Sequence, residues 1–144
     1  MANQGTNIEV LLVEDSAPEA LLTAAQLQDA AGGGVDLAHE SSLTAAMAHL
    51  AEREPDVVLL DPRLPDALRA ASVSRLRAGW PDVPVVVLTG NDDPELAEEM
   101  LAAGADACLS KSEADGADIL RAVNEAARHR LLAEIERLRD SEAR

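Results

Sequence analysis

The sequence predicts an α/β fold built on a five-stranded parallel sheet, and three observations support this prediction. Continuous apolar runs over residues 8–13, 57–60, 85–88 and 107–110 are typical of parallel strands buried on both faces. Segments with helical spacing separate these runs. A polar residue follows each run. Strands joined by single helices require right-handed crossovers, so helices are expected to cover both faces of the sheet.

Cap and turn residues set the bounds of the elements in the first half of the chain. Ser16 caps the first helix, and Pro18 is tolerated in its first turn. Glycines 32–34 end this helix and turn the chain into the second strand. The serine pair 41–42 opens the second helix, which stops before Pro55 because the residue preceding a proline disfavours helical backbone.

Glycine and proline also separate the elements of the second half. The third helix returns to the sheet through residues 79–81, Pro94 lies in the first turn of the fourth helix, and Gly104 ends it. The last helix has no glycine or proline beyond Gly116. The expected strands are residues 8–13, 35–39, 56–61, 85–89 and 107–110, and the expected helices are 17–31, the serine pair to Pro55, 67–78, 94–103 and 115–140.

Length and charge limit the classes of function. With 144 residues the chain is expected to form one domain. The net charge of −15 repels nucleic acid backbones and anionic membrane surfaces, which argues against direct binding to either. Cys108 is the single cysteine and has no disulfide partner within the chain. Because no apolar run approaches membrane-spanning length, we expect a soluble, cytoplasmic protein.

Charged and hydroxyl side chains follow four of the expected strands. Glu14 and Asp15 come after the first strand, Asp61 closes the third, Thr89 closes the fourth, and Lys111 comes just after the fifth. In an open parallel sheet the carboxyl ends of the strands form the edge where ligands bind. These five side chains are therefore expected to converge on one pocket.

The chemistry of this pocket points to phosphoryl transfer. Carboxylates about 4 to 5 Å apart repel each other by roughly 3 to 4 kcal/mol per pair at an effective dielectric constant near 20. Mg²⁺ prefers oxygen ligands of this kind, and Lys111 supplies a second positive charge. A carboxylate beside both is well placed to attack phosphorus. We therefore expect an aspartyl-phosphate site with Asp61 as the acceptor.

The motifs that carry these residues resemble a known family. The acidic pair Glu14-Asp15, the segment from Leu59 to Asp66 around the acceptor, Thr89-Gly90 and Lys111 follow one another in the order found in the receiver domain of bacterial two-component response regulators. The resemblance covers about residues 8–128. It implies a flavodoxin-like, doubly wound sheet with the strand order 2-1-3-4-5.

The resemblance also implies a role for each site residue. A partner histidine kinase or phosphotransfer protein would phosphorylate Asp61 in the presence of Mg²⁺. Asp15 and Asp61 would bind the metal ion directly, Glu14 would act mainly through water, and Arg63 would contribute its backbone carbonyl. The chain would thus be a signalling domain whose only reactions are self-phosphorylation and autodephosphorylation at Asp61.

Further residues would control the phosphoryl group in such a domain. Thr89 and Lys111 would bind its oxygens. Asn91 and Arg63 would border the path of the water that hydrolyses the aspartyl phosphate. They would therefore influence its lifetime.

Four features of the sequence depart from the family pattern. Cys108 stands where an aromatic residue is usual, so the familiar coupling between the threonine and an inward-turning ring cannot operate as such. Ser112 replaces a common proline after the lysine. Residues 67–69 replace a glycine-containing turn, so the start of the third helix is expected to differ. Pro62 has no N–H with which to contact the phosphoryl group.

The last helix is longer than a receiver domain requires. Leu131, Ile135 and Leu138 have the 4-3 spacing of a coiled-coil seam. We therefore expect three parts: a flexible leader over residues 1–7, the receiver domain over 8–128, and a projecting helix over 129–144. This helix is expected to pair two protomers in parallel. Packing of the same stripe on its own domain is the alternative.

Three other functions are compatible with an α/β domain of this kind to different degrees. A receiver-like dimerisation scaffold that works without phosphorylation is the main alternative, and Cys108 and Arg69 keep it open. An aspartate-nucleophile phosphatase would need a second acid two places after Asp61, where Arg63 stands. A flavin carrier is disfavoured because an acidic loop, rather than a phosphate cradle, follows the first strand.

Overall fold

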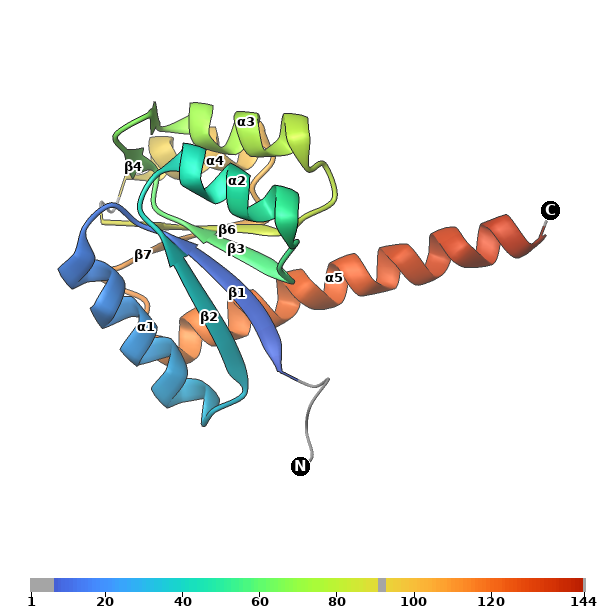
Figure 1. Cartoon of the computed structure of the whole chain (residues 1–144), viewed down its shortest axis with the longest axis horizontal. Helices are drawn as coiled ribbons and strands as arrows, with labels where there is room; N and C mark the ends of the chain where they lie inside the picture. Colours follow the sequence, from blue (N-terminus) through green and yellow to red (C-terminus); the bar gives the residue numbers. More distant parts are fainter. Residues whose placement is uncertain (1–6, 91–92, 144) are drawn as a thin grey trace.

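A five-stranded parallel sheet forms the centre of the molecule (Figure 1). The computed structural model describes residues 7–90 and 93–143, so most of the leader expected over residues 1–7 lies outside the described residues. The strand order β2-β1-β3-β6-β7 is the predicted order 2-1-3-4-5, because β4 and β5 belong to a separate small hairpin. The sheet consists of β1 (Ile8–Val13), β2 (Val35–Glu40), β3 (Val57–Leu60), β6 (Val85–Thr89) and β7 (Ala107–Ser110).

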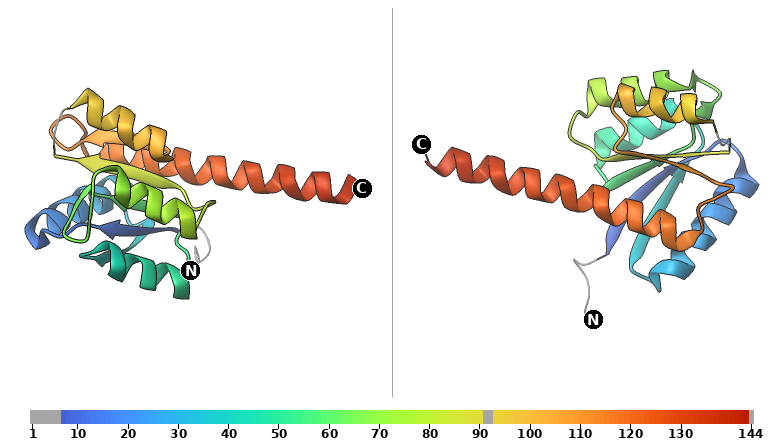
Figure 2. Two further views of the ribbon diagram at one scale, coloured as in Figure 1. Left: turned by 90° about the horizontal axis from the view of Figure 1, so that it is seen from above. Right: turned by 180° about the vertical axis from the view of Figure 1, so that it is seen from behind.

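Helices cover both faces of the sheet, as the sequence predicts. One face carries α1 (Ala17–Ala31) and α5 (Gly116–Ala143), whereas the other carries α2 (Leu43–Glu52), α3 (Ala70–Gly79) and α4 (Pro94–Ala103) (Figures 1 and 2). Each layer has its own aliphatic core. The flavodoxin-like fold class is confirmed.

The prediction of strands buried on both faces is correct for the centre of the sheet and wrong at its edge. Every residue of β3 and β6 is buried, but β7 is only half-buried throughout. The reason is that β7 pairs with β6 on one side only. A continuous apolar run therefore indicated the strand itself but overestimated its burial.

The segment expected to begin the third helix forms a hairpin instead. Residues Arg63–Leu64 (β4) pair antiparallel with Ala67–Leu68 (β5), and α3 begins only at Ala70. Arg69 lies between them with φ 55° and ψ −135°, a backbone conformation that favours glycine. The difference that the missing glycine turn led us to expect is therefore present, and an arginine occupies the strained position.

Close packing of α1 on α5 places the loop that carries Lys111 against the start of α1. A Cβ atom on Gly116 would lie 2.4 Å from the backbone carbonyl oxygen of Gln26. Only glycine permits this approach, because a side chain at residue 116 would push the two helices apart. The loop between β7 and α5 is thereby held next to the site.

Helix α5 continues well beyond the body of the domain (Figure 2). Arg130 forms an ion pair of 3.0 Å with Glu54, and every described side chain of α5 from Leu131 onwards is exposed. Among the helices of the described residues, none is both long and apolar enough to span a membrane.

Candidate functional site

The ends of β1, β3, β6 and β7 bring four of the predicted side chains to one edge of the sheet. The backbone N–H of Asp61 donates to the Val13 carbonyl at 3.0 Å, which joins the ends of β3 and β1. The backbone N–H of Lys111 donates to the Thr89 carbonyl at 2.7 Å, which joins the ends of β7 and β6. Buried apolar strands thus hold the chemically active residues at the point where the sheet stops.

Lys111 is the centre of the site. Its ammonium group donates to Glu14 Oε1 at 2.7 Å, to Asp61 Oδ2 at 2.9 Å and to Glu19 Oε1. Burial alone would lower the pKa of Lys111, but the hydrogen bonds to the three carboxylates outweigh it and hold the pKa above its ordinary value. The lysine therefore carries a permanent positive charge inside the acidic group.

Glu14 is held as firmly as a core residue. It is 2% exposed, its Oε2 atom accepts from the Ser16 backbone N–H at 3.2 Å, and its backbone carbonyl accepts from His39 Nε2 at 2.7 Å. Burial raises the pKa of Glu14 to about 7, and the neighbouring Asp61 adds to the rise while Lys111 opposes it. Burial thus disfavours the ionised form of Glu14 more strongly than the contact with Lys111 favours it.

Asp61 is oriented by two donors. The residue is 6% exposed, its Oδ1 atom accepts from the Arg63 backbone N–H at 2.7 Å, and its Oδ2 atom accepts from Lys111. Pro62 cannot donate, so the next backbone N–H along the chain fixes the carboxylate. This contact involves the N–H of Arg63, and the role expected for the Arg63 carbonyl stays a prediction.

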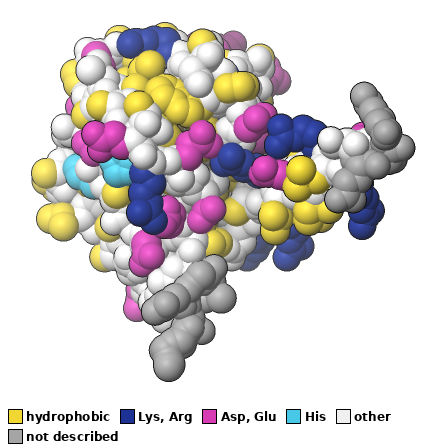
Figure 3. Space-filling model, turned by 45° about the vertical axis from the view of Figure 1, so that its right-hand side comes forward, with side chains coloured by type: hydrophobic (Ala, Val, Ile, Leu, Met, Phe, Trp, Pro, Cys, Tyr) yellow, Lys and Arg dark blue, Asp and Glu magenta, His cyan; other side chains and the backbone are white. Residues whose placement is uncertain are grey.

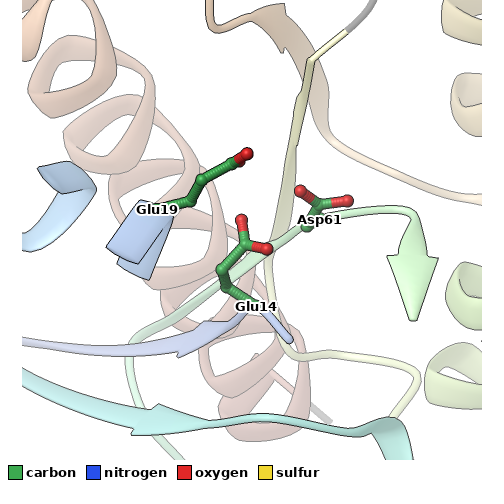
Figure 4. Close-up of side chains that lie close together, drawn as sticks. All are labelled: Glu14, Glu19 and Asp61. Carbon is green, nitrogen blue, oxygen red and sulfur yellow. The ribbon is translucent and has the colours of Figure 1, made fainter. Parts of the chain in front are cut away.

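The carboxylates that lie together are not the three that the sequence suggested. Figure 4 shows Glu14, Glu19 and Asp61 lying together, and one oxygen atom from each lies within 4.8 Å of the others. Asp15 is exposed and does not belong to this group. Glu19 was missed in the sequence analysis. Its spacing from Ser16, which places it in the first helical turn next to the acidic pair, is the signal that could have found it.

The donor atoms fit a hard divalent ion. Mg²⁺ prefers carboxylate, carbonyl and water oxygens, and it commonly uses only one or two protein carboxylates. Asp61 and Glu14 offer such oxygens from a buried position, and Asp15 follows Glu14 at the exposed rim. The composition of the site therefore fits the magnesium ion that the sequence predicted.

The remaining predicted residues border the site. Thr89 is 5% exposed and lies opposite Ser110 in the β6–β7 register. Gly90 and Lys111 line a cleft of ≈ 390 Å³ that also reaches Glu19. Asn91, the residue expected to influence hydrolysis, lies outside the described residues.

Cys108 occupies the position of the usual aromatic residue. Its side chain is half-buried and packs against the aliphatic core that α2, α3 and α4 share with the sheet. Burial raises the pKa of the thiol, so the group stays protonated and behaves as a small apolar side chain.

An open parallel sheet with carboxylates and a lysine at the carboxyl ends of its strands is the arrangement of a receiver domain. The sequence profile described as "Response regulator receiver domain" matches residues 10–124. The chain therefore belongs to the response regulator receiver family, whose domains act in signalling.

Individual relatives agree with this assignment. The transcriptional regulatory protein PhoP of Escherichia coli is 35% identical over 104 residues, which are 72% of this chain and 45% of PhoP. The regulatory protein LuxO of Vibrio vulnificus is 32% identical over 105 residues, which are 72% of this chain and 22% of LuxO. The chain thus spans less than half the length of these relatives.

A solved structure shows a metal ion in a comparable domain. The receiver domain of the sensor histidine kinase PA1611 from Pseudomonas aeruginosa has a TM-score of 0.72 and 25% sequence identity. The match covers 84% of this chain and 98% of that one. In that protein a magnesium ion is coordinated in the active site cleft.

Proposed function

We propose that this chain is a phosphoaccepting receiver in two-component signal transduction and that a histidine kinase or phosphotransfer protein phosphorylates Asp61. The observation that supports the proposal best is the contact of 2.9 Å between Asp61 Oδ2 and Lys111 Nζ in a site that is otherwise acidic. This contact pairs a nucleophile with a fixed positive charge. Both groups stand at the ligand-binding edge of the sheet.

The roles of the residues follow from phosphoryl transfer. An oxygen of Asp61 attacks phosphorus, the bond from phosphorus to the donor atom breaks, and the donor leaves with that electron pair. Lys111 neutralises charge on the transferring oxygens, and the Thr89 hydroxyl stands at the end of the neighbouring strand to bind one of them. The Arg63 N–H keeps the Asp61 carboxylate oriented.

Mg²⁺ completes the proposed site. Glu14, Asp15, Asp61 and the Arg63 carbonyl would hold the ion, and when bound it would supply a second positive charge to the phosphoryl oxygens. The magnesium ion in the PA1611 receiver domain supports this part of the proposal. The buried carboxylate oxygens of Glu14 and Asp61 at this edge of the sheet support it too, because Mg²⁺ prefers oxygen ligands of this kind.

Incubation with acetyl phosphate tests phosphoacceptance directly. Wild-type protein with Mg²⁺ is expected to gain the mass of one phosphoryl group in intact mass spectrometry, and the Asp61→Asn variant is expected to gain none. Wild-type protein with a chelator in place of Mg²⁺ serves as the control and should also stay unmodified. An unmodified wild type in the presence of Mg²⁺ would instead favour the scaffold that works without phosphorylation.

We also propose that the output passes through a homodimer formed by α5. Leu131, Ile135 and Leu138 are 60%, 40% and 58% exposed and share one stripe of the projecting helix. Figure 3 shows hydrophobic side chains gathered on this part of α5, with basic side chains around them. A stripe of this kind is the seam of a coiled coil, with Leu131 and Leu138 at d and Ile135 at a.

The charges beside the seam favour a parallel pair. With Ile135 at a, Glu134 occupies a g position and Arg139 the e position five residues later. In a parallel dimer these two residues face each other across the interface and attract. In an antiparallel dimer g positions face g positions, so the attraction between Glu134 and Arg139 across the interface is lost. A second copy of this chain, aligned in parallel, is therefore the partner that fits the seam.

A further inference from the structure

We propose that Glu19 occupies, before phosphorylation, the place on Lys111 that a phosphoryl oxygen takes afterwards, and that it thereby slows phosphorylation of Asp61. The inference rests on the proposed function. It adds a positioning residue at the start of α1 that regulates the site through Lys111.

The donors of Lys111 are fully used. An ammonium group has three N–H donors, and Lys111 Nζ directs them at three carboxylates, those of Glu14, Asp61 and Glu19. A phosphoryl oxygen can gain a hydrogen bond from Lys111 only if one carboxylate gives up its own.

The exposure of each carboxylate and its other hydrogen bonds indicate which one gives up its contact with Lys111. The Glu14 side chain is 3% exposed and is held by the Ser16 N–H, and the Asp61 side chain is 8% exposed and is the acceptor itself. The Glu19 side chain is 54% exposed. Within the described part of the chain, Lys111 is the only side-chain or backbone partner of the Glu19 carboxylate. Glu19 is therefore the group that can move into water at least cost.

The start of α1 accommodates the released side chain. Ser16 and Glu19 have the spacing of a capping box, and Ser16 Oγ accepts from the Glu19 backbone N–H at 3.3 Å. The reciprocal half of the box is absent, because the Ser16 N–H donates to Glu14 and the Glu19 carboxylate binds Lys111. A carboxylate in the first turn of a helix is also favoured by the helix dipole. The released Glu19 thus keeps a favourable position at the helix terminus.

The negative charge of Glu19 also acts on the incoming donor. One of its oxygens lies within 4.8 Å of oxygens of Glu14 and Asp61, and Glu19 lines the same cleft as Lys111. A phosphodonor carries negative charge and is repelled by a carboxylate at this place. Loss of the charge should therefore increase the rate of phosphorylation and also weaken the contact that occupies one donor of Lys111.

The test compares Glu19→Gln with Asp29→Asn. Asp29 is exposed and lies on the same helix, so its substitution removes one negative charge from α1 away from the site. With acetyl phosphate and Mg²⁺, Glu19→Gln is expected to be phosphorylated at least about threefold faster than wild type, and Asp29→Asn at the wild-type rate. The advantage of Glu19→Gln should shrink as ionic strength rises. Beryllofluoride, which imitates a phosphoryl group, should also bind Glu19→Gln more tightly.

The Mg²⁺ affinity of the variants shows whether Glu19 acts through Lys111 or is itself a ligand of the metal ion. Removal of one nearby negative charge is expected to weaken Mg²⁺ binding in Glu19→Gln slightly, and much less than removal of the Asp61 carboxylate does in Asp61→Asn. An unchanged or lower phosphorylation rate in Glu19→Gln, or a loss of Mg²⁺ affinity as large as that of Asp61→Asn, would overturn the inference. If neither protein acquires a phosphoryl group under any of these conditions, the proposed function itself fails and the inference fails with it.

Discussion

Lys111 determines the geometry of the site at the scale of single residues. Its ammonium group draws together carboxylates that come from the loop after β1, from α1 and from the loop after β3, and that would otherwise repel one another. Glu14 and Asp61 keep their places through backbone donors as well. Glu19 depends on the lysine alone, which is why its position is the adjustable part of the site.

Arg69 has a strained backbone conformation. Its φ of 55° is the only positive φ of a non-glycine residue within the described ranges, and the buried Ser72 donates to its carbonyl at 2.7 Å to hold the turn. We expect Arg69→Gly to be more stable than Arg69→Ala by about 1 kcal/mol, because relief of backbone strain exceeds the added entropy of the unfolded glycine chain.

Chemical denaturation of the two variants measures this difference. Both variants lose the ion pair between Arg69 and Glu99, so the comparison isolates the backbone. Equal denaturation midpoints would show that the turn is relaxed with a side chain present.

Single residues also show where sequence-based prediction succeeds. Asp61, Thr89 and Lys111 could be placed because each ends, or closely follows, a strand, and strand ends meet at one edge. The positions of the Asp15 and Glu19 carboxylates relative to Lys111 could not be predicted, although the spacing of Glu19 from Ser16 marks Glu19 as a candidate site residue. They depend on which side chain the lysine reaches, and this is a property of three-dimensional packing.

At the scale of elements, Asp66 joins the loop after β3 to the start of α2. Its Oδ1 atom accepts from the Leu43 N–H at 2.9 Å, and its Oδ2 atom accepts from the Thr44 N–H at 2.8 Å and from the Thr44 hydroxyl at 2.7 Å. The Thr44 hydroxyl, its N–H and the Leu43 N–H lower the pKa of Asp66 to about 2. The carboxylate thus caps a helix that is distant in sequence, in addition to the local cap Ser42.

Asp66→Ala is expected to destabilise the domain by about 0.5–1 kcal/mol at neutral pH, the lower part of the range for lost helix caps, because the site is exposed. The pKa of Asp66 is lower in the folded chain than in the unfolded chain, so its contribution is complete above about pH 4 and is lost as pH falls towards 2. Urea unfolding of wild type and Asp66→Ala between pH 3 and 6 measures the gap between their free energies of unfolding. A gap that stays constant over this range would contradict the role of the ionised carboxylate.

The elements themselves were largely predictable. Five strands and five helices appear in the expected order, because long apolar runs and clear caps indicate them. The β4–β5 hairpin was not predicted, since two strands of two residues each leave no periodic pattern in a sequence. Its presence shortens α3 at the amino end.

At the scale of the whole molecule, the charged body and the apolar stripe on α5 suggest different partners. The body gathers acidic groups at one edge of the sheet, whereas α5 projects from the opposite part of the domain (Figure 1). A dimer through α5 would leave both phosphorylation sites open to a kinase. The seam contains three apolar residues per helix, so we expect a weak dimer with a micromolar dissociation constant.

Multi-angle light scattering over a range of concentrations tests this assembly. Wild-type protein is expected to approach a dimer at tens of micromolar, and Ile135→Glu is expected to stay monomeric because it places a charge in the seam. Arg137→Gln changes the net charge by the same amount outside the seam and should dimerise like wild type. A wild type that stays monomeric would remove the dimer from the proposal.

Chemical identification of the phosphorylated residue tests most directly whether Asp61 is the phosphoacceptor. After treatment with acetyl phosphate and Mg²⁺, borohydride reduces an aspartyl phosphate to homoserine, and peptide mass spectrometry then identifies the residue that carried the phosphoryl group. Homoserine is expected at position 61 and at no other position that holds an aspartate. Homoserine at Asp15 or elsewhere with residue 61 intact, or no homoserine at all, would contradict it.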